Sequence, residues 1–139
     1  MRDLQLHVEL AGPPILVYAM WLDQAQHGMI TEAFAKINGV IGGQYELWNG
    51  VVRGKFLQLE KPKKIVQTWR TVEFDDVPST TKTTPSSLLT LNLQKRKFGT
   101  RLVVTHERIP AILVEQFEFA WKEFYFPRMR YYFGQSPQS

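Results

Sequence analysis

The chain has 139 residues, a length that fits one domain with its own hydrophobic core, and we expect a single domain over residues 1–139. The absence of cysteine excludes a disulfide framework, a thiolate nucleophile and a cysteine metal site. The net charge is +4, and the chain shows neither a signal-peptide pattern nor an apolar run long enough to span a membrane, so we expect a cytoplasmic protein.

The N-terminal part predicts one strand followed by two short helices. Residues 3–10 alternate apolar and polar side chains, which is typical of a half-buried strand. Pro14 suits the first turn of a helix over residues 15–22, because its missing N–H is not needed there. Asp23 can cap a second helix from Gln24 to about Met29.

The middle of the chain predicts short antiparallel strands separated by turns. Asn49-Gly50 is a strong hairpin signal, because both residues tolerate positive φ in a two-residue type I′ turn. Gly54, inside a strand pattern, indicates a bulge or the close approach of another backbone. Residues 74–87 lack periodicity and are predicted as a loop. The predicted strands are Thr31–Ile37, Gln44–Trp48, Val51–Glu60, Ile65–Val72, and the alternating segments around Leu89–Leu93 and Leu102–His106.

Basic residues gather at two predicted hairpin turns. One cluster contains Lys61, Lys63 and Lys64, and the other contains Lys95, Arg96, Lys97 and Arg101. They can be solvated turn residues that discourage edge aggregation, or a patch for phosphate or an acidic partner. Aromatic residues are not interleaved with these lysines, so we expect no nucleic-acid partner.

A long aromatic helix is predicted from about Leu113. Half of the chain's aromatic residues lie in residues 117–133. Together with the strands it predicts an α+β protein in which this helix lies across the concave face of the sheet. Pro127 inside the helix predicts a kink near residues 123–127, or a helix that ends and restarts there.

This helix has two apolar faces. Phe117 and Trp121 follow the spacing of one face, which is expected to pack on the sheet. A second stripe consists of Phe119, Phe126, Met129 and Phe133. Because one domain does not easily cover both faces, we hypothesise that this stripe forms a homodimer contact or is covered by strand ends.

Five ordered segments resemble a known family. They are PILVYAMWLD (Pro14–Asp23), GQYELWNGVVRG (Gly43–Gly54), LQLEKPKKIVQTWR (Leu57–Arg70), GTRLVVTHERIP (Gly99–Pro110) and WKEFYFPRMRYYF (Trp121–Phe133). Together they resemble the C-terminal domain of the activator of heat-shock protein 90 ATPase, in the START-like SRPBCC superfamily. The resemblance implies the helix-grip fold, as in the birch-pollen allergen, with a curved antiparallel sheet around a long C-terminal helix.

The resemblance also implies a cavity between sheet and helix that binds lipids, hormones, polyketides or other apolar ligands. The residues expected to line it are Trp69, His106, Phe117, Trp121 and Tyr125. His106 and Tyr125 would orient a polar end of the ligand, and the apolar walls would supply affinity. The family implies chaperone and stress-response functions too, but we expect this chain to lack the N-terminal domain that makes much of the chaperone contact.

Three functions remain open. The first is binding of an apolar or amphipathic small molecule, and the second is a co-chaperone-like interaction with a heat-shock protein 90 homologue. The third is a cyclase or hydrolase, which we favour less, since His106 is the main acid–base candidate and is better explained by a structural hydrogen bond. His7, His27 and His106 lack metal-type spacing, so we predict no metal site, and we expect no cofactor.

Overall fold

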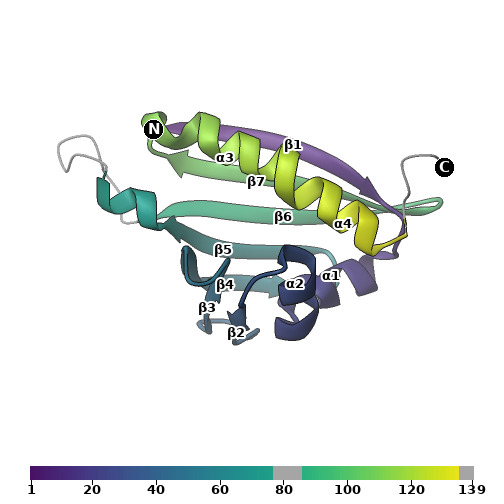
Figure 1. Cartoon of the computed structure of the whole chain (residues 1–139). Helices are drawn as coiled ribbons and strands as arrows, with labels where there is room; N and C mark the ends of the chain where they lie inside the picture. The colour runs from purple at the N-terminus through teal and green to yellow at the C-terminus, as the bar shows by residue number, and fades with distance from the viewer. Residues whose placement is uncertain (77–85, 135–139) are drawn as a thin grey trace.

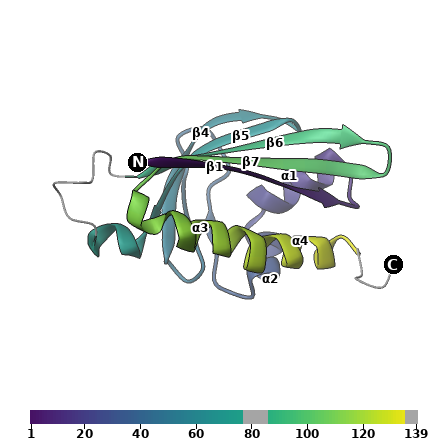
Figure 2. The same cartoon turned by 90° about the horizontal axis from the view of Figure 1, so that it is seen from above.

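The chain folds into a seven-stranded antiparallel sheet that curves around a long C-terminal helix (Figure 1). The computed structural model describes residues 1–76 and 86–134. The strand order is β1-β7-β6-β5-β4-β3-β2, so the first strand of the chain lies beside the last. Seen from above, the helix lies along one face of the sheet, and α2 lies on the same side (Figure 2). This arrangement confirms the expected α+β helix-grip fold.

The strands alternate buried and exposed side chains as the sequence predicts. In β5 every second residue is buried, with Ile65, Gln67, Trp69 and Thr71 facing the helix side. The elements in chain order are β1 (Arg2–Leu10), α1 (Pro14–Leu22), α2 (Gln24–Thr31), β2 (Lys36–Ile37), β3 (Gln44–Leu47), β4 (Val52–Glu60), β5 (Lys64–Thr71), the 3₁₀ helix η1 (Val72–Asp76), β6 (Ser87–Arg96), β7 (Gly99–Ile109), the 3₁₀ helix η2 (Ala111–Leu113), α3 (Val114–Ala120), the π-helical turn η3 (Trp121–Tyr125) and α4 (Phe126–Tyr132).

The connection between β1 and the sheet follows the predicted pair of short helices. Pro14 begins α1, and the Asp23 carboxylate accepts a hydrogen bond from the Gln26 backbone N–H at 2.8 Å, which confirms the predicted cap. The prediction of a strand over Thr31–Ile37 is wrong for most of its length. Thr31 is the last residue of α2, and the left-handed Glu32 ends the helix. The Thr31 hydroxyl donates to the carbonyl oxygen of His27 at 3.2 Å.

The predicted hairpin at Asn49-Gly50 is present, but its loop is longer than two residues. Leu47 pairs with Val52, so the loop spans four residues, and Trp48, Asn49 and Gly50 have φ of 54°, 60° and 89°. The Asn49 side chain explains this shape, since its oxygen accepts the backbone N–H of Phe34 at 2.7 Å. The loop is therefore fixed by a contact outside the hairpin.

Gly54 confirms the close backbone approach that its position in a strand predicts. A Cβ atom at this residue would lie 2.1 Å from the carbonyl oxygen of Thr68 and 2.8 Å from the Tyr45 hydroxyl. The predicted loop over residues 74–87 is only partly described, because residues 77–85 lie outside the described residues. At its ends, Phe74 belongs to η1 and is fully buried, and Ser87 begins β6.

The C-terminal helix is continuous, and its irregularity lies where Pro127 predicts it. The backbone N–H of Phe126 bonds the carbonyl oxygen of Trp121, five residues back, which makes the turn π-helical. A proline ring clashes with the carbonyl of the fourth preceding residue in a regular helix, and a wider turn relieves that clash. The helix therefore continues past Pro127 without a break.

The second aromatic stripe is not one exposed surface, so cover within one chain, the alternative to a dimer contact, applies to most of its residues. Phe126 and Met129 are buried in the core of the same chain, and the Phe133 ring lies against Gly12 after β1. Phe133 is half-buried, and Phe119, which is 57% exposed, is the one member that is mostly open to solvent. One chain covers most of this face because β1 and α2 both pack against α4.

Candidate functional site

A cavity of about 420 Å³ opens between the C-terminal helix and strands β4 and β5. This volume falls within the range of small-molecule sites, roughly 300–1,000 Å³. Its sheet side consists of Val52, Trp69 and Thr71, and the β3–β4 loop adds Trp48 and Val51. Its helix side consists of Phe117, Ala120, Trp121, Phe124 and Tyr125.

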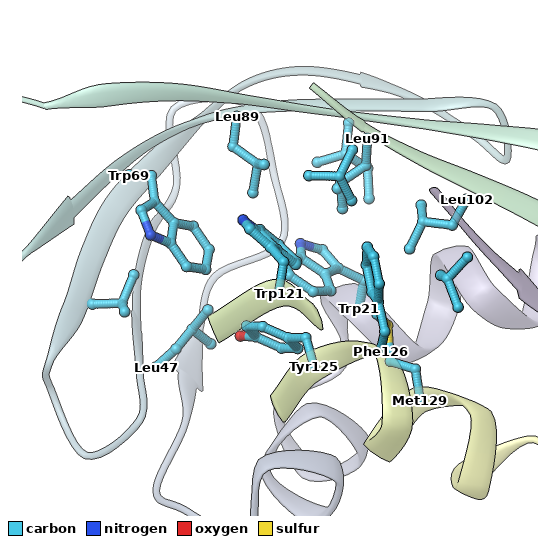
Figure 3. Packing of buried hydrophobic residues seen from close by; sticks show 14 of the residues in the cluster. Trp21, Leu47, Trp69, Leu89, Leu91, Leu102, Trp121, Tyr125, Phe126 and Met129 are labelled. Carbon is cyan, nitrogen blue, oxygen red and sulfur yellow. The ribbon is translucent and has the colours of Figure 1, made fainter. Parts of the chain in front are cut away.

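Stacked aromatic rings separate this cavity from the rest of the core. Trp69 points down from the sheet, and Trp121 and Tyr125 come from the helix (Figure 3). The ring centroids of Trp69 and Trp121 are 5.6 Å apart, and those of Trp121 and Tyr125 are 4.9 Å apart. Trp21 from α1 stacks behind Trp121 at 6.1 Å and fills the remaining space between helix and sheet. The cavity is therefore confined to one side of the interface.

Four of the five residues predicted to line a cavity meet here. Trp69, Phe117, Trp121 and Tyr125 all line the space, whereas His106 does not. His106 lies on the expected inward face of β7, but it is fully buried beneath the aromatic layer. Its ring stands edge-on to Trp69, with centroids 5.7 Å apart.

His106 holds two walls of the cavity in place. Its Nδ1 accepts a hydrogen bond from Trp121 Nε1 at 3.2 Å, so its proton sits on Nε2 and is donated to Ser87 Oγ at 2.7 Å. Ser87 Oγ in turn donates to the carbonyl oxygen of Trp69 at 2.7 Å. Burial lowers the pKa of His106 from 6.5 to about 3, so the ring is neutral at physiological pH.

A second buried histidine, His27, supports Tyr125 on the helix side of the cavity. His27 of α2 donates from Nδ1 to the carbonyl oxygen of Trp21 at 2.8 Å, which leaves Nε2 to accept from the Tyr125 hydroxyl at 2.9 Å. Burial lowers the pKa of His27 to about 4, although its backbone hydrogen bond acts in the opposite direction. The sequence left His27 as a surface or structural residue. Ile30 and Thr31 follow His27 by three and four residues, so the three share one helix face, and this spacing could have predicted that His27 is buried.

Polar groups lie at the two ends of the cavity. At one end Thr71 is joined by Glu73 of η1 and Gln116 of α3. At the other end Arg128 pairs with Glu32 at 2.8 Å, and its guanidinium lies 5.7 Å from the Trp48 ring centroid. The walls between are apolar, so the cavity favours a flat apolar body with a polar group at an end.

Two further features concern metal and membrane. Over residues 1–76 and 86–134, no three His, Asp or Glu side chains gather closely enough to hold a metal ion. Within the same residues, no helix is both long and apolar enough to cross a membrane.

The two basic clusters do occupy hairpin turns, one between β4 and β5 and one between β6 and β7. In the second, Arg101 and Arg96 both pair with Glu9 of β1. Phe98 at the tip of that hairpin is 82% exposed.

Comparisons with known proteins agree on the fold and the family. A solved structure described as PFC0360w, an HSP90 activator from Plasmodium falciparum, is 21% identical with a TM-score of 0.82, over 94% of this chain and 95% of that one. The Aha1 dimer from Colwellia psychrerythraea is 13% identical with a TM-score of 0.78, over 98% and 99% of the two chains. MLL2253 from Mesorhizobium loti is 16% identical with a TM-score of 0.74, over 94% and 96%.

A curated relative matches only part of the chain. It is the uncharacterized protein C1711.08 of Schizosaccharomyces pombe, 38% identical over 68 residues, which are 49% of this chain. These 68 residues make up 20% of that protein, so the matched half of the chain corresponds to about a fifth of its length. The model of the family described as Activator of Hsp90 ATPase homolog 1-like protein matches residues 11–134, which confirms the resemblance seen in the sequence. The chain belongs to this family.

Proposed function

We propose that this chain binds a small, flat apolar molecule in the cavity between the sheet and the C-terminal helix. The observation that carries this proposal is the cavity itself, about 420 Å³ in volume and walled by aromatic rings from opposite sides. Trp69 on the sheet and Trp121 on the helix present ring surface to the same space. Aromatic walls of this kind favour stacking on a planar ligand.

The proposal is tested with the neutral fluorescent probe prodan, whose emission shifts to the blue in an apolar site. We expect saturable binding to the intact chain, and native mass spectrometry of freshly purified protein will show any molecule retained from the cell. Ala120→Leu places three extra carbon atoms in the cavity and will abolish prodan binding. Ala111→Leu makes the same change at an exposed position outside the cavity and serves as the control. Equal prodan binding by both variants would contradict the proposal.

The second candidate function is an interaction with a heat-shock protein 90 homologue. It is favoured by the likeness to the Plasmodium protein described as an HSP90 activator, which extends over 94% of this chain. The basic turn at Lys95 and Lys97 offers a surface for an acidic partner, and both side chains are exposed. Capture of the chaperone and a rise in its ATPase rate are expected, and both will weaken when Lys95 and Lys97 are replaced by glutamate.

Lys55→Glu, on the exposed side of β4, provides a control for the general effect of charge reversal. No capture and no change in ATPase rate with the unmodified chain would end this candidate. The result is independent of prodan binding, so the two functions are tested separately.

A further inference from the structure

The end of the cavity where β5 runs into η1 carries three polar side chains. Thr71, Glu73 and Gln116 line the cavity there. The rings of Phe74 and Phe117, with centroids 6.3 Å apart, hold η1 against the start of α3. The segment that carries Glu73 is therefore packed against the helix segment that carries Gln116.

Thr71 supplies the sharpest observation. It is 7% exposed, and its hydroxyl is buried without a hydrogen-bond partner among the described residues. Most buried hydroxyl groups in proteins are hydrogen-bonded, because an unpaired one is destabilising. The sequence of β5 would tolerate valine at this position for packing alone. Because Thr71 lines the cavity, rotation about its Cα–Cβ bond would present the hydroxyl to a group that enters.

The neighbours of Thr71 define the charge at this end. Glu73 is half-buried and anionic, and Gln116 is exposed and offers an amide oxygen. Arg128, a cation in the lining, lies at the opposite end, roughly 18 Å from Gln116 along the helix. Its charge is paired with Glu32 at 2.8 Å. Arg70, whose guanidinium lies 5.4 Å from the Phe74 ring centroid, does not line the cavity and is paired with Asp75. The lining at the Thr71 end is therefore rich in hydrogen-bond acceptors and negative.

We propose that the molecule bound in this cavity is a planar aromatic compound carrying a protonated amine, with the amine at the Thr71 end. This inference rests on the proposed small-molecule function and names its ligand class. An alkylammonium group has three N–H donors, and the Thr71 hydroxyl, the Glu73 carboxylate and the Gln116 amide offer acceptors for them. The aromatic walls also attract a cation. A carboxylate in the same place would meet the like charge of Glu73.

Three probes with one ring system test the inference. They are 2-naphthylmethylamine, 2-naphthylmethanol and 2-naphthoate, which present a cation, a neutral alcohol and an anion, and they are compared by calorimetry and by displacement of prodan. We expect the amine to bind about tenfold more tightly than the alcohol, and the anion to bind most weakly.

Two substitutions locate the amine. Thr71→Val keeps the shape of the side chain and removes the hydroxyl, and we expect amine binding to weaken roughly threefold to tenfold. Thr71→Ser keeps the hydroxyl and is the control. Glu73→Gln removes the charge and should bring amine and alcohol binding close together. Circular dichroism and thermal unfolding of each variant confirm that it is folded.

The outcomes separate the two proposals. If no probe and no prodan binds, the small-molecule function fails and the ligand class fails with it. If prodan binds, and either the alcohol or the anion binds at least as tightly as the amine, the small-molecule function stands and the proposed ligand class is wrong. If the amine is preferred but Thr71→Val and Glu73→Gln leave that preference unchanged, its placement at this end is wrong.

Discussion

The C-terminal helix meets the sheet differently on its two sides. Toward β6 and β7 the space is filled, with Phe126 and Met129 on the side of Leu91 and Leu102 (Figure 3). Toward β4 and β5 the same helix leaves the cavity of about 420 Å³. The rings of Trp121 and Tyr125 stand between the two sides, so one layer of aromatic residues is both the edge of the core and the wall of the site.

The difference arises from what reaches the interface from elsewhere in the chain. Trp21 enters from α1, stacks on Trp121, and donates its Nε1–H to the Gln67 side chain of β5 at 2.8 Å. On the open side the nearest cover is the β3–β4 loop, whose Trp48 stands edge-on to Tyr125 with centroids 5.3 Å apart. The filled side of the interface therefore depends on Trp21 of α1. The open side depends on the distance between the β3–β4 loop and the helix.

The strongest test of the filled side is the removal of a buried side chain. Leu91→Ala leaves a void in the core and is expected to lower the free energy of unfolding by about 2–5 kcal/mol. Leu57→Ala, at a position 42% exposed, is the control and should change it by less than about 0.5 kcal/mol. Urea unfolding measures both. Prodan binding should survive in Leu91→Ala, and its loss would show that the two sides are not separable.

The two buried histidines give the next largest effect, and it depends on pH. Burial lowers the pKa from 6.5 to about 3 in His106 and to about 4 in His27. Between these values and 6.5 the unfolded chain binds protons that the folded chain does not, so stability falls as the pH falls. From pH 7.5 to pH 5 each histidine should lower the free energy of unfolding by about 2 kcal/mol.

His106→Gln and His27→Gln should each remove its own share of this pH dependence, whatever their effect on stability at pH 7.5. His7→Gln, on the exposed side of β1, is the control and should retain the full slope. Urea unfolding at a series of pH values measures the slope. An unchanged slope in both buried variants would mean that these rings titrate normally in the folded chain.

Much of the fold was predictable because alternation and turn chemistry are local. The inward faces of β5 and β7, the Asp23 cap and the irregular helix near Pro127 all follow from neighbouring residues. The Thr31–Ile37 prediction failed for the same reason, since apolar spacing in a short segment does not distinguish a helix end from a strand. There the left-handed Glu32 ends α2 only after Thr31, and no spacing of apolar residues marks that end.

The candidate site was predictable only in part, because it depends on contacts distant in the sequence. Trp69, Trp121 and Tyr125 could be placed on inward faces, and they do line the cavity. The same inward alternation placed His106, yet it lies beneath the rings rather than beside the ligand space. No local sequence pattern shows that Trp21 fills the space beside Trp121. The burial of Phe126 likewise depends on elements that are distant in the sequence and pack against the helix only in the folded chain.

Tyr125→Phe tests how the wall between the two sides is held. The substitution removes the hydroxyl that donates to His27 Nε2 at 2.9 Å, which leaves a buried acceptor unpaired. We expect the free energy of unfolding to fall by about 1–3 kcal/mol. Tyr131→Phe, at a position 76% exposed, should have almost no effect. Equal stability of the two variants would show that the His27–Tyr125 bond does not hold this wall.

The smallest change in the free energy of unfolding is expected at Thr71, and here the substitution should stabilise the chain. Thr71→Val removes a buried hydroxyl that has no partner among the described residues, so the free energy of unfolding should rise by about 1 kcal/mol. Thr71→Ser keeps the hydroxyl and loses a buried methyl group, so it should be less stable than the unmodified chain. Thermal unfolding in the absence of ligand measures both changes.

A destabilised Thr71→Val would mean that the hydroxyl already contributes to the fold, and the open side would then lose its unused polar group. A stabilised Thr71→Val variant that also binds 2-naphthylmethylamine less tightly would show that the hydroxyl serves the ligand and not the fold. Stability gained and binding lost at one atom is what a group retained for a ligand should produce, because the proposed amine would supply the hydrogen-bond partner that the fold does not. On the filled side the Gln67 side-chain nitrogen is also buried without a partner among the described residues, but Gln67 does not line the cavity, so its replacement should leave amine binding unchanged.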